Sequence, residues 1–409
     1  MSVAFSCDEV YFMKYHFSRD LCDSDRAQLN RALDFFNITA YFKTVDGQEE
    51  LFGFGAQQEA DVPNKLNGTM IFGGYPFDQQ VVENSKLMNG IWFVPIIFVK
   101  ITQNIVIFES DTVENFNEWL TKFKTIARSK VVSHVITSEL DWTSRTQKLI
   151  NTIISNDKLK KVVFGRQHQY ALSDTLLAST LVHALITQKN TYHVILKYQK
   201  EMFVSATPER LVKVTDGAVT TAAVAGTIRR GNTQTEDKLL GDMLLNSHKN
   251  QQEHRYVVNS IYQKIQNMTT SLNLPPQPIL LQNRQLQHLY TPISARLIKK
   301  YTVLDIVNAL HPTPALGGVP QKQALDYIRA HERSPRGLFA APIGYYTSNN
   351  SGEFVVGIRS MYINHAAHTA TLFAGAGIVS DSNATQEYQE TNLKLEPMRQ
   401  LLKGDVNDN

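Results

Sequence analysis

The stretch YHVILKYQKEMFVSATPERLVKVTDGAVTTAAV, residues 192–224, decides the fold class. Short runs rich in β-branched and aromatic residues alternate in it with turn residues such as Asp216 and Gly217. Strands separated by so few residues are expected to pair in antiparallel fashion, because a parallel pair needs a long crossover connection. The stretch therefore predicts an antiparallel sheet. Its strands are expected at 192–198, 202–206, 211–214 and 218–224.

Helices and further strands are predicted on both sides of this stretch. Apolar residues at helical spacing, such as Leu177, Leu181 and Leu185, predict a helix over 174–188. The pattern indicates an α+β fold in which helices pack on antiparallel sheets. The other helices are expected at 236–265, 303–310, 321–331 and 382–402, the last interrupted by Pro397. The other strands are expected at 162–172, 337–346, 354–364 and 369–373.

Composition limits the class of protein. Of the 409 residues, 43% are hydrophobic and 19% are charged, which is typical of a globular chain and excludes a disordered or collagen-like one. The formal net charge is only +3, so charge does not by itself indicate a nucleic-acid or membrane-surface partner. A charged ligand would have to be bound by a local group of residues.

Neither a membrane span nor a disulfide framework is predicted. The longest apolar run, 91–99, contains Pro95 and is far shorter than the roughly 20 residues that cross a bilayer. Residues 1–25 have no sustained apolar segment, so no signal peptide is expected and a cytoplasmic location is the default. Cys7 and Cys22 are the only cysteines, too few for a disulfide scaffold.

The last predicted helix carries a charged stripe. Glu387, Glu390 and Lys394 stand at positions i, i+3 and i+7, so their side chains project from one face. A solvated row of ion pairs is the ordinary interpretation. However, Gly375 and Gly377 lie just before the helix, and a ligand can approach backbone N–H groups where side chains are missing. A ligand site is therefore the alternative.

Glu253 lies within the predicted helix 236–265. Alone it would be a surface carboxylate, and the adjacent His254 would be a packed or capping histidine. Together with Glu390 from a distant helix, Glu253 could provide the pair of carboxylates that Mg2+ accepts, because this ion retains waters and shares its shell with an anionic substrate. A magnesium site is therefore a hypothesis.

Lys161 and Glu209 suggest acid–base chemistry. Lys161 precedes a predicted strand, and Glu209 follows the turn at Pro208. Each alone would be an ordinary exposed residue. On either side of one substrate, however, a lysine with a lowered pKa could act as a general base while a protonated glutamate acts as a general acid. This pairing suits the exchange of one hydroxyl for another.

Arg359 interrupts an otherwise apolar strand, and its forked guanidinium could bind a carboxylate through two hydrogen bonds. An arginine at a sheet edge is the structural alternative. Residues 311–318, HPTPALGG, combine rigid and permissive backbone, as a loop that lines a binding site would. A purely structural turn is an equal possibility for this loop.

Many segments of the chain match one family in the right order. They resemble the chorismate-utilising enzymes, and within that family the isochorismate synthases, over about residues 158–400. The matching segments are KVVFGR (161–166), SATPERLV (205–212), AGTIRRG (225–231), KNQQEHRYVV (249–258), HLYTPI (288–293), LHPTPALGG (310–318), RGLFAAPIGY (336–345), VVGIRS (355–360), AGAGIVSDS (374–382) and QEYQETNLK (386–394). GGYPFD (73–78) and IWFVP (91–95) match more loosely.

The resemblance implies one large α+β domain. Two antiparallel sheets pack together in this fold, helices lie outside, and the active site lies in a cleft between the sheets. Residues 1–145 would be a variable N-terminal part of the same fold, 146–403 the chorismate-binding catalytic core, and 404–409 a C-terminal tail.

The resemblance also implies roles for single residues. Lys161 would activate the water that attacks C2 of chorismate, and Glu209 would protonate the departing C4 hydroxyl. Glu253 and Glu390 would hold Mg2+ on the ring carboxylate, with Glu387 in or next to its shell. Asn250 departs from the acidic residue of several relatives, which puts that outer position in doubt. The predicted substrate-binding residues are Thr227, His288, Ala315, Leu316, Arg359, Lys394 and the backbone amides of Gly375 and Gly377.

The same resemblance indicates the type of reaction. Anthranilate synthases use ammonia and lack the lysine that corresponds to Lys161, so water is the expected nucleophile. Members that eliminate pyruvate typically have Thr where this chain has Ala315, so isomerisation without elimination is expected. The segments IWFVP, ATPERLV and KN favour the menaquinone-type enzymes over those of catechol siderophore synthesis.

Other functions are left open. A salicylate synthase would release pyruvate, and an aminodeoxychorismate-type enzyme would use ammonia. An inactive chorismate-binding protein is a different class, because a fold does not guarantee activity. Chorismate is the expected ligand, an enzyme that consumes isochorismate is a possible partner, and a monomer or a homodimer is expected.

Overall fold

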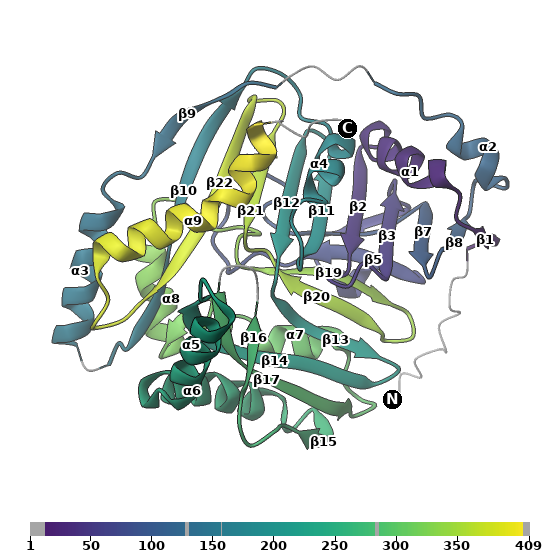
Figure 1. Ribbon diagram of the computed structural model, residues 1–409. Helices are drawn as coiled ribbons and strands as arrows, with labels where there is room; N and C mark the ends of the chain where they lie inside the picture. Colours follow the sequence, from purple (N-terminus) through teal and green to yellow (C-terminus); the bar gives the residue numbers. More distant parts are fainter. Residues whose placement is uncertain (1–12, 127–130, 157, 283–285, 404–409) are drawn as a thin grey trace, which may run out of the picture.

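The computed structural model describes residues 13–126, 131–156, 158–282 and 286–403. Within these ranges the strands form two antiparallel sheets, one of 12 strands and one of 10, and helices pack around them (Figure 1). The predicted α+β fold of two antiparallel sheets is confirmed. The predicted tail 404–409 and Cys7 lie outside the described residues. No helix in these ranges is long and apolar enough to cross a membrane.

The first sheet joins the N-terminal part of the chain to the C-terminal part. Its strands, in spatial order, are β1 (Tyr15–Asp20), β8 (Ile105–Ser110), β7 (Ile97–Thr102), β3 (Glu49–Phe54), β2 (Ile38–Lys43), β11 (Tyr192–Tyr198), β12 (Glu201–Thr207), β21 (Ser360–Asn364), β22 (Thr369–Ile378), β10 (Lys161–Leu172) and β18 (Gly318–Val319), while β9 (Ser133–Ser138) also pairs with β10.

The second sheet is built in the same way from both parts of the chain. Its strands, in spatial order, are β15 (Thr269–Asn273), β17 (Leu286–Leu297), β14 (Ala218–Arg229), β13 (Arg210–Thr215), β20 (Gly352–Val356), β19 (Pro342–Thr347), β5 (Met70–Gly74), β6 (Ile91–Val94) and β4 (Gln58–Ala60), while β16 (Ile279–Gln282) also pairs with β17.

Aromatic side chains join the two sheets. Phe42 of β2 meets Tyr345 of β19 edge to face, with ring centroids 5.2 Å apart. Phe72 of β5 lies 6.2 Å from Phe98 of β7. All four side chains are buried in one hydrophobic core. Burial of each such side chain stabilises the fold by about 1.5–3 kcal/mol, so this core holds the sheets against each other.

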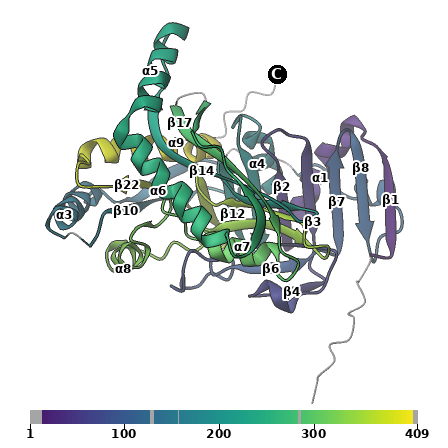
Figure 2. The same cartoon turned by 90° about the horizontal axis from the view of Figure 1, so that it is seen from below.

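Helices cover the sheets on their other sides (Figures 1 and 2). Leu29, Leu181 and Leu395 belong to three helices and share a second core with the first sheet. The three helices are α1 (Asp23–Phe35), α4 (Ala178–Leu185) and α9 (Ala384–Lys403). A fourth helix, α2 (Phe116–Leu120), contributes to the same core. The others are α3 (Trp142–Ser155) and α8 (Gln321–His331) beside β10, and α5 (Gln234–Asn246), α6 (His248–Ile265) and α7 (Val303–Leu310) against the second sheet, with a short 3-10 turn at Pro63–Lys65.

Two helix predictions were wrong in detail. The long helix expected at 236–265 is divided into α5 and α6, because Ser247 has an extended backbone and its side chain caps the new helix by accepting a hydrogen bond from Asn250 N. The last helix is not interrupted at Pro397, which lies inside a continuous α9. The predicted helices 303–310 and 321–331 are confirmed.

The expected strand 354–364 is divided between the two sheets. Its first part is β20 in the second sheet and its second part is β21 in the first, and Arg359 between them has a positive φ of 47°. The chain also crosses between the sheets from β12 to β13, at Pro208 and Glu209. The strand expected from residue 337 begins only at Pro342, because Gly337 and Ala340 have positive φ and cannot extend a strand.

Candidate active site

The chain crosses from one sheet to the other at Pro208 and Glu209 and again at Arg359, and these two crossings lie side by side. The N–H of Ala206 donates to the carbonyl of Arg359 over 3.0 Å, and the N–H of Val356 donates to the carbonyl of Glu209 over 3.0 Å. Ser205 Oγ adds a hydrogen bond of 2.6 Å to the carbonyl of Ile358. Backbone contacts therefore place Glu209 and Arg359, the predicted general acid and a predicted carboxylate ligand, at the same junction of the two sheets.

Glu209 keeps a partly exposed surface, but the surrounding protein shields its carboxyl group from most of the water. Burial raises the pKa of its carboxyl to about 7, and the positive charge of Lys394 opposes this rise. Among the described residues, no side chain forms a hydrogen bond or ion pair with this carboxyl group. A glutamic acid of this kind is largely protonated in mildly acidic solution, so it can donate a proton to a leaving group.

Arg359 is the cation of the same junction. Burial lowers the pKa of its guanidinium, while the negative charge of Glu390 opposes this effect. The guanidinium of an arginine remains charged near neutral pH even when its pKa is lowered. Because water is largely excluded around Arg359, its attraction for a carboxylate is strengthened.

Lys161 begins β10 and points toward α6. Its Nζ lies 2.9 Å from Glu253 Oε1, and both side chains are partly exposed. Gly377 of the neighbouring β22 permits this course, because a Cβ at Gly377 would lie 2.9 Å from Lys161 Cε. The predicted base and one predicted metal ligand are therefore in direct contact.

The charged stripe of α9 faces the same region. Lys394 Nζ donates to the carbonyl of Gly375 over 2.8 Å and lies 2.6 Å from Glu390 Oε1. Burial raises the pKa of Glu387, the charge of Glu390 raises it further, and a 2.8 Å hydrogen bond from Ser382 Oγ opposes both. The ordinary interpretation of a solvated stripe does not apply to Glu387, which is partly buried.

Thr227 and His288 lie opposite each other on β14 and β17, and Thr227 Oγ1 is 2.9 Å from His288 Nδ1. Burial lowers the pKa of His288, and the charges of Arg359 and Lys394 lower it further. The imidazole is therefore neutral near pH 7 and can act as a hydrogen-bonding group beside the two cations.

The predicted charged residues thus gather from distant parts of the chain. Each of four residues has its pKa shifted by the charge of another residue of the group, which shows that they lie near one another; these four are Glu209, His288, Arg359 and Glu387. Lys161 and Glu253 are joined by their ion pair. The polar cluster, as we call it below, consists of Lys161, Glu209, Glu253, His288, Arg359, Glu387, Glu390 and Lys394.

The predicted backbone ligands lie beside the polar cluster. Gly375 and Gly377 face Gly165 and Val163 across the ladder between β22 and β10. The carbonyl of Gly375 accepts a hydrogen bond from Lys394, so it points away from β10. In an antiparallel strand the N–H and C=O of one residue point to the same side, so the N–H of Gly375 also points away from β10. This edge is free of β21, whose pairing with β22 ends at Phe373. The amide of Gly375 is therefore directed toward the cluster.

Leu316 and Ala315 belong to the loop before β18. Leu316 has its side chain in the hydrophobic core, while Ala315 is partly exposed. Gly318 packs against the backbone of Lys161, since a Cβ there would lie 2.1 Å from the carbonyl oxygen of Lys161. Ala315 is therefore the better placed of the two predicted side chains to contact a ligand.

His254 follows the ordinary interpretation. It is buried, and its ring nitrogens lie 3.2 Å from the carbonyl of Ala225 and 2.7 Å from Thr291 Oγ1. Burial lowers its pKa, so this histidine is a packed neutral group.

The sequence did not reveal all the residues around the site. Glu332 and Arg336 form a buried ion pair that contacts the backbone of β10 just after Lys161. Their spacing of four residues was a possible signal, but the sequence does not show which strand they reach.

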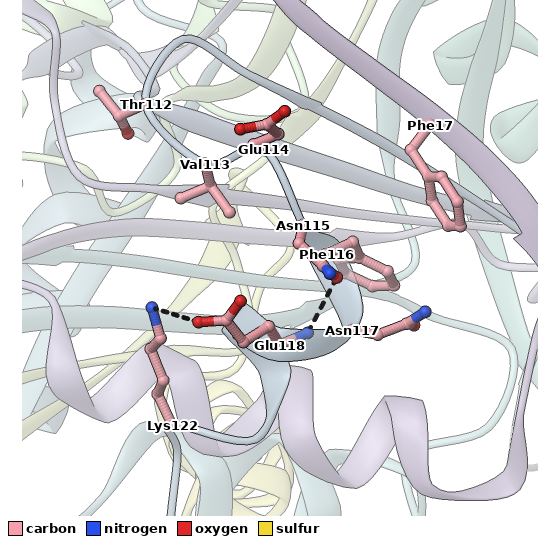
Figure 3. Close-up of a pocket in the computed structure, with 9 residues that line it drawn as sticks. All are labelled: Phe17, Thr112, Val113, Glu114, Asn115, Phe116, Asn117, Glu118 and Lys122. Carbon is pink, nitrogen blue, oxygen red and sulfur yellow. Dashed lines mark hydrogen bonds and ion pairs between the residues drawn. The ribbon is translucent and has the colours of Figure 1, made fainter.

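A hollow of about 650 Å3 lies elsewhere, beside α2 (Figure 3). Asn115, Glu118 and Lys122 line it and interact with one another, since Asn115 Oδ1 caps Glu118 N and Lys122 Nζ lies 3.9 Å from Glu118 Oε1. None of the predicted site residues borders this hollow, so it bears on no predicted role.

Comparison with known proteins shows the family. The chain matches the family model described as "Chorismate binding enzyme" over residues 37–403. It is 34% identical over 390 residues to isochorismate synthase MenF of Bacillus subtilis (strain 168), covering 89% of this chain and 82% of the relative. The chain therefore belongs to the chorismate-binding enzyme family. The sequence-based predictions that the chain belongs to this family and that it is an enzyme are both confirmed.

Two further similarities extend the comparison. The chain is 38% identical over 263 residues to the salicylate biosynthesis isochorismate synthase of Pseudomonas aeruginosa, which covers 64% of this chain and 55% of the relative. The structure of the menaquinone-specific isochorismate synthase MenF from Escherichia coli is similar with a TM-score of 0.78 and 24% identity, over 97% of this chain and 96% of that one. The latter similarity concerns the fold.

Proposed function

We propose that this protein is an isochorismate synthase, an isomerase that converts chorismate into isochorismate reversibly. The observation that carries the proposal is Glu209, whose pKa is raised to about 7 by burial, in one polar cluster with Lys161. Lys161 removes a proton from a water molecule, whose oxygen forms a bond to C2. The ring double bonds shift, the C4–O bond breaks, and Glu209 donates the proton with which the hydroxyl leaves as water.

The substrate carboxylates would be held by the cations of the cluster. Arg359 provides a planar fork of donors for one carboxylate, and Lys394 with the amides of Gly375 and Gly377 provides donors for another. Thr227, His288 and Ala315 would line the ring, while Leu316 would support this lining from the hydrophobic core. The desolvation that raises the pKa of Glu209 also strengthens these ionic contacts.

Mg2+ is the cofactor that we propose. The described residues contain no group of three or more acidic, histidine or cysteine side chains that could hold a metal by themselves. The available donors are nevertheless suitable, because carboxylate oxygens are hard ligands and Mg2+ needs only one or two of them beside water and substrate. Burial raises the pKa of Glu387 and the negative charge of Glu390 adds to this rise, so a cation between them would relieve their repulsion.

In the proposed arrangement Glu253 and Glu390 hold the ion, with Glu387 in or next to its shell. When bound, Mg2+ would neutralise the ring carboxylate of the substrate. Glu253 would then have to exchange its contact with Lys161 for the ion, and Glu390 its contact with Lys394.

The direct test is to incubate the purified protein with chorismate and Mg2+, without ammonia, and to separate the products while assaying pyruvate. Isochorismate without pyruvate, lost on adding EDTA, is expected. Salicylate with an equal amount of pyruvate would refute the isomerase proposal and the argument from Ala315. Absence of turnover, with or without ammonia, would favour a binding protein without activity.

For the pathway, we propose menaquinone synthesis. The support is the sequence similarity to MenF of Bacillus subtilis over most of the chain, together with the segments IWFVP, ATPERLV and KN. Deletion of the gene should lower the cellular menaquinone content, and a loss of catechol siderophore with unchanged menaquinone would contradict the proposal. A cytoplasmic location, a monomer or homodimer and a downstream enzyme that consumes isochorismate stay predictions.

A further inference from the structure

The strand that carries Lys161 has an edge with a gap. On one side β10 pairs with β22 from Val162 to Ala171. On the other side it pairs with β18 at Lys161 and Val162, and with β9 only from His168 onward. Between these partners, no strand of the described chain pairs with residues 163–167. Backbone groups in the gap need other partners, because unpaired buried N–H and C=O groups are costly.

Side chains fill the gap. The carbonyl of Val163 accepts from Arg336 Nη2 over 2.6 Å, and the N–H of Gly165 donates to Glu332 Oε1 over 2.6 Å. Farther from Lys161, Trp142 Nε1 donates to the carbonyl of Gly165 over 3.0 Å, and the N–H of Gln167 donates to Glu139 Oε1 over 2.8 Å. The N–H of Val163 donates to the carbonyl of Gly317 over 2.9 Å, so the side-chain contacts nearest to Lys161 come from the pair Glu332 and Arg336.

Arg336 also holds the loop on the other side of Lys161. Its Nη1 donates to the carbonyl of Leu316 over 2.9 Å, and its Nε donates to Glu332 Oε2 over 2.9 Å. The guanidinium is 2% exposed and lies over the ring of Phe77, 4.3 Å from the centroid. One rigid group thus ties the β10 backbone to the loop that contains Ala315.

Glu332 approaches β10 closely at Gly165, where any added side chain would displace its carboxylate. A Cβ at Gly165 would lie 2.9 Å from Glu332 Oε1. In contrast, neither Glu332 nor Arg336 contacts a residue of the polar cluster by any hydrogen bond or ion pair among the described residues. Their influence on the reaction would have to act through the backbone of β10 and the loop.

We propose that Glu332 and Arg336 are positioning residues that fix Lys161 relative to the substrate. This inference rests on the proposed function, since it concerns the base of that reaction. The guanidinium fork is essential to it, because a lysine ammonium cannot hold Glu332, Val163 and Leu316 in the same fixed geometry. The pair acts on catalysis more than on substrate affinity, which depends on Arg359 and Lys394 of other elements.

The test compares Glu332→Gln with Glu139→Gln. The two glutamates are matched, because each side chain is 9% exposed, accepts a β10 N–H and pairs with an arginine. We expect Glu332→Gln to lower kcat about tenfold and Arg336→Lys to lower it about 100-fold, each with KM within about threefold of wild type. Glu139→Gln should lower the melting temperature to a similar extent as Glu332→Gln but keep kcat within about twofold.

The possible outcomes separate the two proposals. Wild-type protein that makes no isochorismate refutes the proposed function, and the positioning role is refuted with it. Active wild-type protein with equal kcat in Glu332→Gln and Glu139→Gln refutes only the positioning role and leaves a purely structural one. A rise of KM at constant kcat in Arg336→Lys would also overturn it. Should Arg336→Lys fail to fold, the isosteric Glu332→Gln still decides the question.

Discussion

The start of β10 and the crossing from β12 to β13 each carry one proposed catalytic residue, but the two places treat a charge in different ways. Lys161 lies 2.9 Å from a carboxylate of α6, with which it forms an ion pair. Glu209 has no ion-pair partner among the described residues, and burial raises its pKa to about 7. The difference shows that one site can stabilise a charged lysine through an ion pair and, a short distance away, favour the neutral form of a glutamic acid by removing water from it.

The strongest test of this comparison removes the lysine. Lys161→Ala should lower kcat by about 10^4-fold, because it deletes the proposed base and leaves the fold intact. Turnover is measured by product chromatography and folding by circular dichroism. The adjacent, exposed Lys160 provides the control, since Lys160→Ala should keep nearly full activity. Near-normal turnover of Lys161→Ala would refute the role of base.

Glu209→Gln should lower kcat by about 10^3-fold, because the amide is neutral like the protonated acid but cannot donate its proton to a leaving hydroxyl. The variant should still bind chorismate, as measured by calorimetry. An activity within a few-fold of wild type would assign the proton donor elsewhere. Equal losses of binding and kcat would instead indicate that Glu209 positions the substrate.

The pH profile distinguishes the two residues. The acid form of Glu209 is required and its pKa is raised to about 7, so kcat/KM should fall as the pH rises through this value, by about tenfold per pH unit above it. Below pH 7 this group should cause no loss. Rates measured between pH 5.5 and 9 check this, and the basic limb near 7 should be missing from the residual activity of Glu209→Gln. A flat profile across this range would contradict a desolvated acid.

The metal proposal predicts a change in Glu390→Gln. Loss of one carboxylate should raise the Mg2+ concentration for half-maximal activity by about 10- to 100-fold, and chorismate binding should weaken with it. Magnesium titrations at fixed chorismate measure this shift. An unchanged magnesium requirement would place the ion elsewhere.

The smallest effect is expected from Gly377→Ala. The new Cβ would lie 2.9 Å from Lys161 Cε, so the lysine side chain would have to move by a few tenths of an ångström. We expect about a tenfold loss of kcat with KM little changed, measured in the same assay. Unchanged kcat would show that the course of the lysine is not restricted at this point.

Local patterns explain what the sequence predicted well. The predicted helices at 303–310 and 321–331 agree with α7 and α8, because their apolar spacing and terminal signals lie within the segments themselves. Candidate site residues such as Lys161 and Glu390 were found because family motifs surround them. The structure brings them into one region, while their roles stay proposals.

The failures concern contacts between distant residues. Residues 354–364 read as one apolar strand, yet the chain crosses between sheets at Arg359, which depends on the packing of both sheets. The break at Ser247 is an exception, because its signal is local: the Ser247 side chain accepts a hydrogen bond from Asn250 N and caps α6. Glu332 and Arg336 are an ordinary i, i+4 pair in sequence, and only the fold shows that they reach the open edge of β10.

The filled gap in β10 also has a consequence for self-association. An open edge in a sheet can add a strand from another molecule, which leads to aggregation. Between residues 163 and 167, the N–H of Val163 is bonded to the carbonyl of Gly317. The carbonyls of Val163 and Gly165 and the N–H groups of Gly165 and Gln167 are bonded to side chains of Arg336, Trp142, Glu332 and Glu139. These bulky and charged groups occupy the place of a strand, so the centre of β10 offers no ladder for a second chain to extend.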